Sequence, residues 1–227
     1  SSATCYRKVD PSAAVGRYRS AISLLCDNGR LLQAAKLSRE VAELFEKGET
    51  CDDDSDVTNV AQAIDHYHQA AELFATETSN SHRSQCMAKV AELCSAALEP
   101  PDMLRASEIY DALGRDSLAY NYLQYKAKDY FLRSILCQLA NDDSVGACVA
   151  LSRYESLDYT FADSREGKFC RRLIQCVEGY DVEGIATACF EYDRITKLDP
   201  LETTLLLRVK ELIEDHIKDD GDEVDLT

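Results

Sequence analysis

Apolar residues recur along this chain with the spacing of α-helices. The clearest stretch follows Gly179, where the apolar positions are Val182, Ile185, Ala186, Cys189 and Phe190. They follow the i, i+3, i+4, i+7, i+8 stripe that gives an amphipathic helix one apolar face. Because no stretch shows the alternating pattern of a half-buried strand, the sequence predicts an all-α fold.

One small-and-large pair recurs five times along the chain. An alanine stands four residues before a tyrosine at Ala14 and Tyr18, Ala63 and Tyr67, Ala106 and Tyr110, Ala150 and Tyr154, and Ala188 and Tyr192. Residues four apart share a helix face, so each pair lets a neighbouring helix approach and interlock. A period near 40 residues, with room for two helices, is typical of a helical solenoid, and chance recurrence is the weaker explanation.

Helix start and stop signals divide the chain into hairpins. Capping acids precede helices at Asp10-Pro11, at Asp199-Pro200 and at Asp163, which opens a capping-box pattern closed by Glu166. The expected helix ends are at Gly29, Gly48, Gly114 and Gly179, with a further break at Pro100-Pro101. The predicted helices are 11–27, 31–47, 57–77, 81–98, 101–113, 116–140 with an internal break, 144–157, 164–178, 181–196 and 200–217.

We therefore predict a TPR-like α-solenoid of antiparallel helical hairpins that ends in a C-terminal helical bundle. The predicted divisions are a solenoid over residues 1–143, a bundle over 144–217 and an acidic tail over 218–227. Such stacked hairpins bury their apolar faces only against their neighbours.

Charge and cysteine usage narrow the partners and the compartment. A formal charge of −16 over 227 residues argues against nonspecific binding to nucleic acid, because the phosphate backbone would repel the molecule. The ten cysteines include no CxxC pair and mostly lie on apolar helix faces, so we expect buried free thiols and a reducing compartment. No apolar run approaches the roughly 20 residues that span a bilayer, and no signal-peptide pattern is present, so we expect a cytoplasmic protein.

Motifs for catalysis, nucleotides and metals are absent from the sequence. It contains no GxxxxGK[ST], HExxH, GxSxG or Rossmann glycine pattern. His66 and His68 are two residues apart and point to different helix faces, and the acidic segment 49–56 lacks the spacing of a calcium loop. A cysteine nucleophile with a histidine base stays open, although nothing selects one cysteine. We predict a non-enzymatic protein without metal or cofactor that presents a surface to another protein.

Five segments, in order along the chain, resemble the soluble NSF attachment proteins (SNAPs), most closely the alpha type. They are ATETSNSHRSQCMAKVAEL, KAKDYFLRSILC, ESLDYTFADSREGKFCRRL, FEYDRITKLDPLETTLLLRVKELI and the closing GDEVDLT. The resemblance implies an adaptor that lies along the acidic SNARE four-helix bundle and recruits the ATPase NSF, the N-ethylmaleimide-sensitive factor. It also implies vesicle trafficking as the process and peripheral association with the cytosolic face of membranes.

The resemblance assigns the SNARE-binding residues. Arg30, Lys36, Lys89 and Lys128 match basic positions of the family, and Tyr122 stands where the family has a smaller apolar contact residue. A local basic stripe can act in an acidic molecule because screening over about 8 Å lets nearby charges dominate. The alternative for each cation is a solvated helix residue. Gln85 replaces a common lysine, which should weaken SNARE binding or transfer the load to Arg83.

The resemblance also assigns the NSF-binding residues to the C-terminal part. They are Asp142, Asp143 and Glu178 on the bundle, and Asp222, Glu223, Asp225 and Leu226 in the tail. Gln175 replaces a further acid of the family. The penultimate leucine of the family is linked to stimulation of the ATPase, and Leu226 holds that place.

The sequence departs from the family at its N-terminus, and two other classes of protein are alternatives. The family begins with further hairpins and an apolar membrane-contacting loop that this sequence lacks, so we expect a truncated chain with weaker SNARE binding on membranes. Within the same fold, a gamma-type SNAP or another repeat scaffold would bind a different partner, such as a chaperone tail. A helical subunit of an enzyme complex, such as a prenyltransferase-like alpha subunit, is disfavoured because the chain has no tryptophan.

Overall fold

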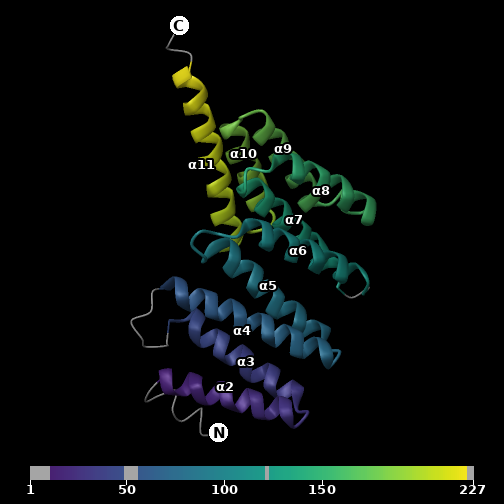
Figure 1. The fold of residues 1–227 in the computed structure, drawn as a ribbon. Coiled ribbons are helices and arrows are strands. Elements are labelled where there is room, and N and C mark those ends of the chain that lie inside the picture. The colour runs from purple at the N-terminus through teal and green to yellow at the C-terminus, as the bar shows by residue number, and fades with distance from the viewer. Residues whose placement is uncertain (1–10, 49–55, 121–122, 224–227) are drawn as a thin grey trace. The chain divides into compact units, whose positions relative to one another are not determined.

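The computed structural model describes residues 11–48, 56–120 and 123–223, with side chains over 15–48, 58–120 and 123–218. These residues form ten α-helices and no strand, which confirms the predicted all-α class (Figure 1). The helices are α2 (Pro11–Asp27), α3 (Leu31–Glu46), α4 (Asp56–Thr76), α5 (Asn80–Ala96), α6 (Met103–Leu118), α7 (Gln124–Ala140), α8 (Ser144–Leu157), α9 (Arg165–Glu178), α10 (Val182–Asp193) and α11 (Pro200–Glu223).

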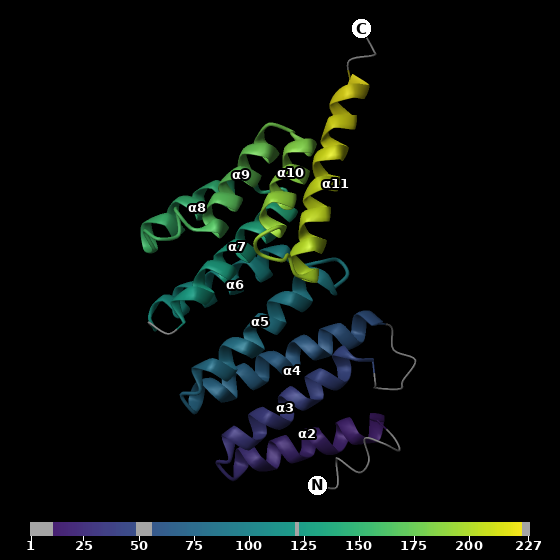
Figure 2. The same ribbon diagram turned by 180° about the vertical axis from the view of Figure 1, so that it is seen from behind.

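The chain divides into two compact units, Ser1–Pro101 and Asp102–Thr227. In the first unit, α2, α3, α4 and α5 each pack against their neighbours in sequence, as expected for stacked hairpins. In the second unit, α7 contacts α6, α8, α9 and α11, so this unit is built as a bundle around one central helix (Figure 2). The sequence boundaries at residues 143 and 217 stay predictions about the repeat organisation.

The alanine-and-tyrosine pairs mark the first helix of every hairpin. They lie on α2, α4, α6, α8 and α10, and all five tyrosine rings are buried. The alanines described with side chains, Ala63, Ala106, Ala150 and Ala188, are buried with them. The repeat read from the sequence is therefore the packing unit of the fold.

Two of these tyrosines also bond to the preceding helix through their hydroxyl groups. Tyr67 on α4 donates to a Glu46 carboxylate oxygen on α3 at 2.6 Å, and Tyr154 on α8 donates to Ser134 Oγ on α7 at 2.9 Å. Burial raises the pKa of Tyr154 to about 12, so the hydroxyl stays protonated at neutral pH. The ring supplies buried area while its polar end is satisfied by a fixed partner.

An aromatic cluster holds the second unit together. The rings of Phe131 on α7 and Tyr154 on α8 stack with their centroids 4.0 Å apart, and Phe161 meets both edge-on at 5.6 and 6.2 Å. Gly114 of α6 faces the same cluster, where a Cβ atom would lie 2.4 Å from the Phe131 ring. The prediction that Gly114 ends a helix is wrong, because the glycine lies inside α6 and makes room for Phe131.

The helix ends follow most of the predicted signals. Gly29 and Gly48 have φ of +70° and +63°, a conformation that glycine adopts at little cost. Asp199 and Glu202 form a reciprocal capping box, since each side chain accepts from the backbone N–H of the other, at 2.7 and 3.2 Å. Asp10 and residues 49–55 lie outside the described part of the chain.

Three predicted helix limits need correction. The cap of α9 is Ser164 rather than Asp163, because Ser164 Oγ accepts from the Gly167 N–H at 3.0 Å. The break predicted inside 116–140 is present, but the predicted gap before residue 116 is not, because α6 continues through Gly114 to Leu118 and α7 begins at Gln124. Helix α11 continues to Glu223 rather than ending at residue 217, since the acidic sequence retains helical backbone there.

Most of the described cysteines are buried free thiols, as expected from the sequence. Eight cysteines are described, all free, and the buried ones are Cys86, Cys94, Cys137, Cys170 and Cys176. Burial raises the pKa of Cys86 to about 11, as expected for an inert core thiol. Over the side chains that the structure describes, no group of three or more His, Cys, Asp or Glu residues is placed to hold a metal ion. Among the same residues, no helix combines the length and hydrophobicity needed to cross a bilayer.

One arginine joins α7 to the start of α11. The guanidinium of Arg133 pairs with Asp199 and lies 3.5 Å from Glu202, and its Cζ atom is 6.0 Å from the Tyr110 ring centroid. Burial raises the pKa of Glu202, and the neighbouring Asp199 charge adds to the effect, although Arg133 opposes both. Arg133 therefore partly offsets the cost of burying the Glu202 carboxylate beside Asp199.

Substitution of Gly114 tests the close approach of α6 and α7. We expect Gly114→Ala to lower the free energy of unfolding by about 1–3 kcal/mol, because the new methyl group would overlap the Phe131 ring. The control is Gly16→Ala in α2, where a Cβ atom meets nothing within 4 Å and helix propensity should raise stability by about 0.5–1 kcal/mol. Urea unfolding followed by circular dichroism measures both, and a Gly114→Ala protein as stable as the original would contradict the packing.

Substitution of Arg133 tests the junction and its pH dependence. We expect Arg133→Met to cost about 2–3 kcal/mol at pH 7, because Asp199 and Glu202 lose their counter-charge. Since the folded-state pKa of Glu202 is already raised, its ionised form costs stability, and the deficit should shrink as the pH falls toward that pKa. The exposed pair of Lys197 and Asp193 gives the control, Lys197→Met, with an effect of about 0–1 kcal/mol. Urea midpoints at pH 7 and pH 5 that show an equal deficit would count against this account.

Candidate protein-binding surfaces

The basic residues assigned by resemblance lie on the second helices of successive hairpins. Arg30 directly precedes α3 and Lys36 lies within it, while Lys89 lies on α5 and Lys128 on α7. Arg30 and Lys36 are exposed, and neither forms an ion pair with another residue that the structure describes. In the first unit, α3 and α5 both pack against α4, so its candidate cations come from the two helices beside α4.

Lys89 is held by two carboxylates of its own chain. Its Nζ atom lies 3.0 Å from Glu46 Oε1 on α3 and 3.1 Å from Glu92 Oε1 one turn further along α5. Partial burial by itself favours the neutral amine, but the hydrogen bonds to Glu46 and Glu92 outweigh it and raise the pKa of Lys89. Burial opposes the ionisation of Glu46, yet the bonds from Tyr67 and Lys89 lower the pKa of its carboxyl. The pair therefore remains charged at neutral pH, and a partner of Lys89 must compete with Glu46.

The replaced position Gln85 lies on the same side of α5 as Lys89. Gln85 is exposed and stands four residues before Lys89, so the two side chains are one turn apart. Arg83 is only two residues from Gln85, and helix geometry turns it to a different side. The suggested transfer of binding from Gln85 to Arg83 is not favoured by this arrangement.

Lys128 lines a groove that sequence reasoning did not find. The groove has a volume of about 440 Å³ and is lined by Leu118, Gln124, Tyr125, Lys128, Leu157, Asp158, Tyr159 and Thr160. Tyr125 and Tyr159 are 65% and 86% exposed, so two large aromatic side chains beside this groove are open to a partner. The available signal was Leu157 at the end of one predicted helix and Tyr159 just after it, but only the fold places them beside Lys128. Tyr122 lies outside the described residues.

The acidic residues assigned to NSF gather at one end of the second unit. Asp142 is exposed in the turn between α7 and α8 with φ of +60°, and its carboxylate lies 3.0 Å from His216 Nε2 on α11. The Tyr180 ring, in the turn between α9 and α10, meets the His216 ring edge-on with centroids 6.2 Å apart. Because Glu178 ends α9 just before this turn, α11 brings Glu178 and Asp142 to the same end of the bundle.

Asp143 and Glu178 differ in how much of the carboxylate is free to bind a partner. Asp143 caps α8, where its Oδ1 atom accepts from the Gly146 N–H at 2.7 Å, so part of its carboxylate is already engaged. Glu178 and Gln175 are exposed on the last turn of α9, three residues apart on one side. Asp222 and Glu223 lie in the last turn of α11, but their side chains are outside the described part, and Asp225 and Leu226 lie beyond it.

Comparison with known proteins relates this chain to one protein family. The family described as "Soluble NSF attachment protein, SNAP" matches residues 1–214. An alpha-soluble NSF attachment protein of Vitis vinifera is 38% identical over 92% of this chain and 68% of its own length. A beta-soluble NSF attachment protein of Bos taurus is 36% identical over 96% of this chain and 69% of its own. A vesicular-fusion protein SEC17 of Komagataella phaffii is 32% identical over 98% of this chain and 71% of its own.

These matches confirm the resemblance read from the five sequence segments. They cover nearly all of the chain, and they include attachment proteins of both the alpha and beta types. Members of the family are adaptors rather than enzymes, in agreement with the predicted class. The chain belongs to the soluble NSF attachment protein family.

Proposed function

We propose that this chain is an adaptor that binds SNARE four-helix complexes and recruits and stimulates the ATPase NSF. In this role the chain would support the disassembly of SNARE complexes in vesicle trafficking and membrane fusion, and NSF would hydrolyse the ATP. Family membership is the observation that carries the proposal. The candidate cations and acids lie on separate helices and turns, which supports the proposal that each partner binds a different set of residues.

The SNARE-facing part of the proposal rests on Arg30, Lys36, Lys89 and Lys128. Exposed ion pairs contribute individually only about 0–1 kcal/mol, so the cations would act together against the acidic bundle. Lys36 is exposed and ready to pair, whereas Lys89 must exchange Glu46 for a carboxylate of the partner. The groove beside Lys128 adds exposed Tyr125 and Tyr159, which can bury apolar area that the cations alone cannot.

The NSF-facing part rests on Asp142, Asp143, Glu178 and the acidic tail. The gathering of Asp142 and Glu178 at one end of the second unit offers a basic partner several carboxylates at once. Asp143 can take part through the carboxylate oxygen that does not cap α8. From family membership we assign the protein to the cytoplasm, with peripheral association at the cytosolic face of membranes. We expect no nucleic-acid partner, because the formal charge of −16 would repel the phosphate backbone.

Charge substitution on α3 and α5 tests SNARE binding. We expect Lys36→Glu with Lys89→Gln to weaken binding to an assembled SNARE complex by about tenfold or more, since each lost contact contributes up to about 1 kcal/mol and the new acid repels. The control, Arg105→Glu with Arg194→Gln, changes the net charge equally through exposed residues outside this surface. Surface plasmon resonance with immobilised SNARE complex measures both. An unaltered chain that does not bind, or an equal loss in the control, would contradict the assignment.

Substitution of Leu226 tests the tail, because it should change the stimulation of NSF without changing SNARE binding. We expect Leu226→Ala to bind SNARE complex like the original protein but to reduce the stimulation of NSF several-fold, because the penultimate leucine that the family links to this stimulation is removed. Ile217→Ala on α11 is the matched control, since Ile217 is 45% exposed and precedes the tail. Phosphate release by NSF in the presence of SNARE complex gives the rate. If Leu226→Ala stimulates NSF fully, the tail leucine has no part in the activity.

A further inference from the structure

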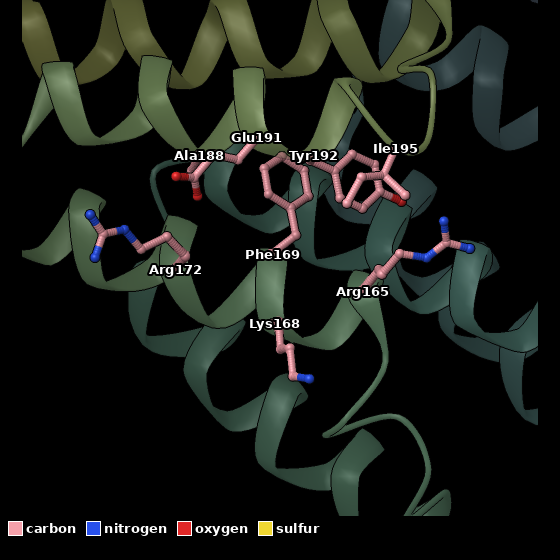
Figure 3. A pocket seen from close by; sticks show the side chains of 8 residues that line it. All are labelled: Arg165, Lys168, Phe169, Arg172, Ala188, Glu191, Tyr192 and Ile195. Carbon is pink, nitrogen blue, oxygen red and sulfur yellow. The ribbon is translucent and has the colours of Figure 1, made fainter.

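A basic groove lies between α9 and α10 of the second unit, apart from every residue assigned above. Its volume is about 190 Å³, and it is lined by Arg165, Lys168, Phe169, Arg172, Ala188, Glu191, Tyr192 and Ile195 (Figure 3). The rings of Phe169 and Tyr192 stack with centroids 4.3 Å apart and form its floor. Ile195 is 71% exposed at one end, so the groove combines an apolar base with an uncovered apolar side chain.

Three cations of α9 that line this groove have no ion-pair partner among the described residues. Arg165, Lys168 and Arg172 are exposed, and none forms an ion pair with a residue that the structure describes. Figure 3 shows Arg165 and Arg172 on either side of the Phe169 ring, with Lys168 directed away from α10. Other cations of the second unit are paired: Arg171 with Glu155, Arg153 and Arg115 with Asp111, and Lys210 with Glu214. In a chain of net charge −16, three cations without ion pairs on one helix face give a surface suited to an anionic partner.

We propose that this groove binds an acidic peptide segment that inserts one apolar side chain between α9 and α10. Arginine pairs with carboxylates in a two-pronged geometry, so Arg165 and Arg172 can hold acids on both sides of the inserted side chain. The volume is below the roughly 300–1,000 Å³ of small-molecule pockets, which suits a single side chain rather than a compact ligand.

The opposite wall limits what the partner can be. Glu191 of α10 lines the groove across from Arg172, and its exposed carboxylate would repel a uniformly anionic surface. A peptide can direct its acids toward α9 and neutral or basic residues toward Glu191, whereas an anionic membrane cannot. The groove therefore favours a peptide with one acidic edge over a lipid headgroup layer. This site goes beyond the proposed function, whose SNARE-binding residues lie on α3, α5 and α7 or directly before α3.

Binding of a designed peptide tests the groove. The probe is a fluorescein-labelled peptide of about ten residues with glutamates flanking one phenylalanine, an acidic anchor segment of the kind that grooves accept. We expect Arg165→Glu with Arg172→Glu to weaken its binding by about tenfold or more, since two attractive charges become repulsive. Ile195→Asn should weaken it several-fold, and a peptide with glutamine in place of glutamate should bind as poorly as the double variant. Fluorescence anisotropy measures each affinity, and circular dichroism confirms that the variants fold.

A crossed control separates this site from the SNARE surface. Arg105→Glu with Lys36→Glu changes the net charge as much as the groove variant and should leave peptide affinity within about twofold, because both residues lie outside the groove. The groove variant should in turn leave binding to the SNARE complex unchanged. Equal peptide affinity in the groove variant, or binding of phosphatidylserine vesicles through Arg165 and Arg172 in place of the peptide, overturns the proposal. A loss of SNARE binding in the groove variant would also overturn it, since the groove would then belong to the SNARE surface.

Discussion

The fold depends on the packing of one large ring against a small residue of an adjoining helix. In the second unit this contact is concentrated at Phe131, which fits over Gly114 of α6 and stacks on Tyr154 of α8. Protein interiors tolerate little excess volume, so the small residue is as necessary as the large one. The alanine and tyrosine pairs of the first helices also combine a small and a large residue, one turn apart on the same helix face, and their described side chains are buried.

Close packing of the hairpins determines which charges are free to bind a partner. Long side chains on neighbouring helices come within reach of one another, and several cations described in the second unit are paired with an acid of an adjacent turn or helix. Lys89 shows the same effect in the first unit, where Glu46 of α3 engages it before any partner arrives. Lys36 and the three groove cations are among those without an ion-pair partner in the described part of the chain, and such cations give an acidic molecule localised binding sites rather than a uniformly basic surface.

The two units differ in how much of their surface comes from distant parts of the sequence. Successive helices pack in order in the first unit, so its candidate cations lie at or in α3 and in α5, the two helices that pack against α4. In the second unit, α11 returns to α7 and its His216 contacts both Asp142 and Tyr180. An acidic surface assembled from two turns and a long helix can hold a partner in a defined orientation, because its parts are fixed by the bundle core.

The sequence by itself determined the helical class, the repeat and the family, because these depend on local periodicity and on motifs that are continuous in the chain. It placed the five buried tyrosines correctly, yet it took Gly114 for a helix end, because the same residue type serves turns and close helix contacts. Only the tertiary structure showed that Lys89 is paired, that Leu157 and Tyr159 lie beside Lys128, and that α9 and α10 enclose a basic groove. Charge pairing and concave surfaces depend on distances between residues far apart in the chain, and local sequence patterns do not specify those distances.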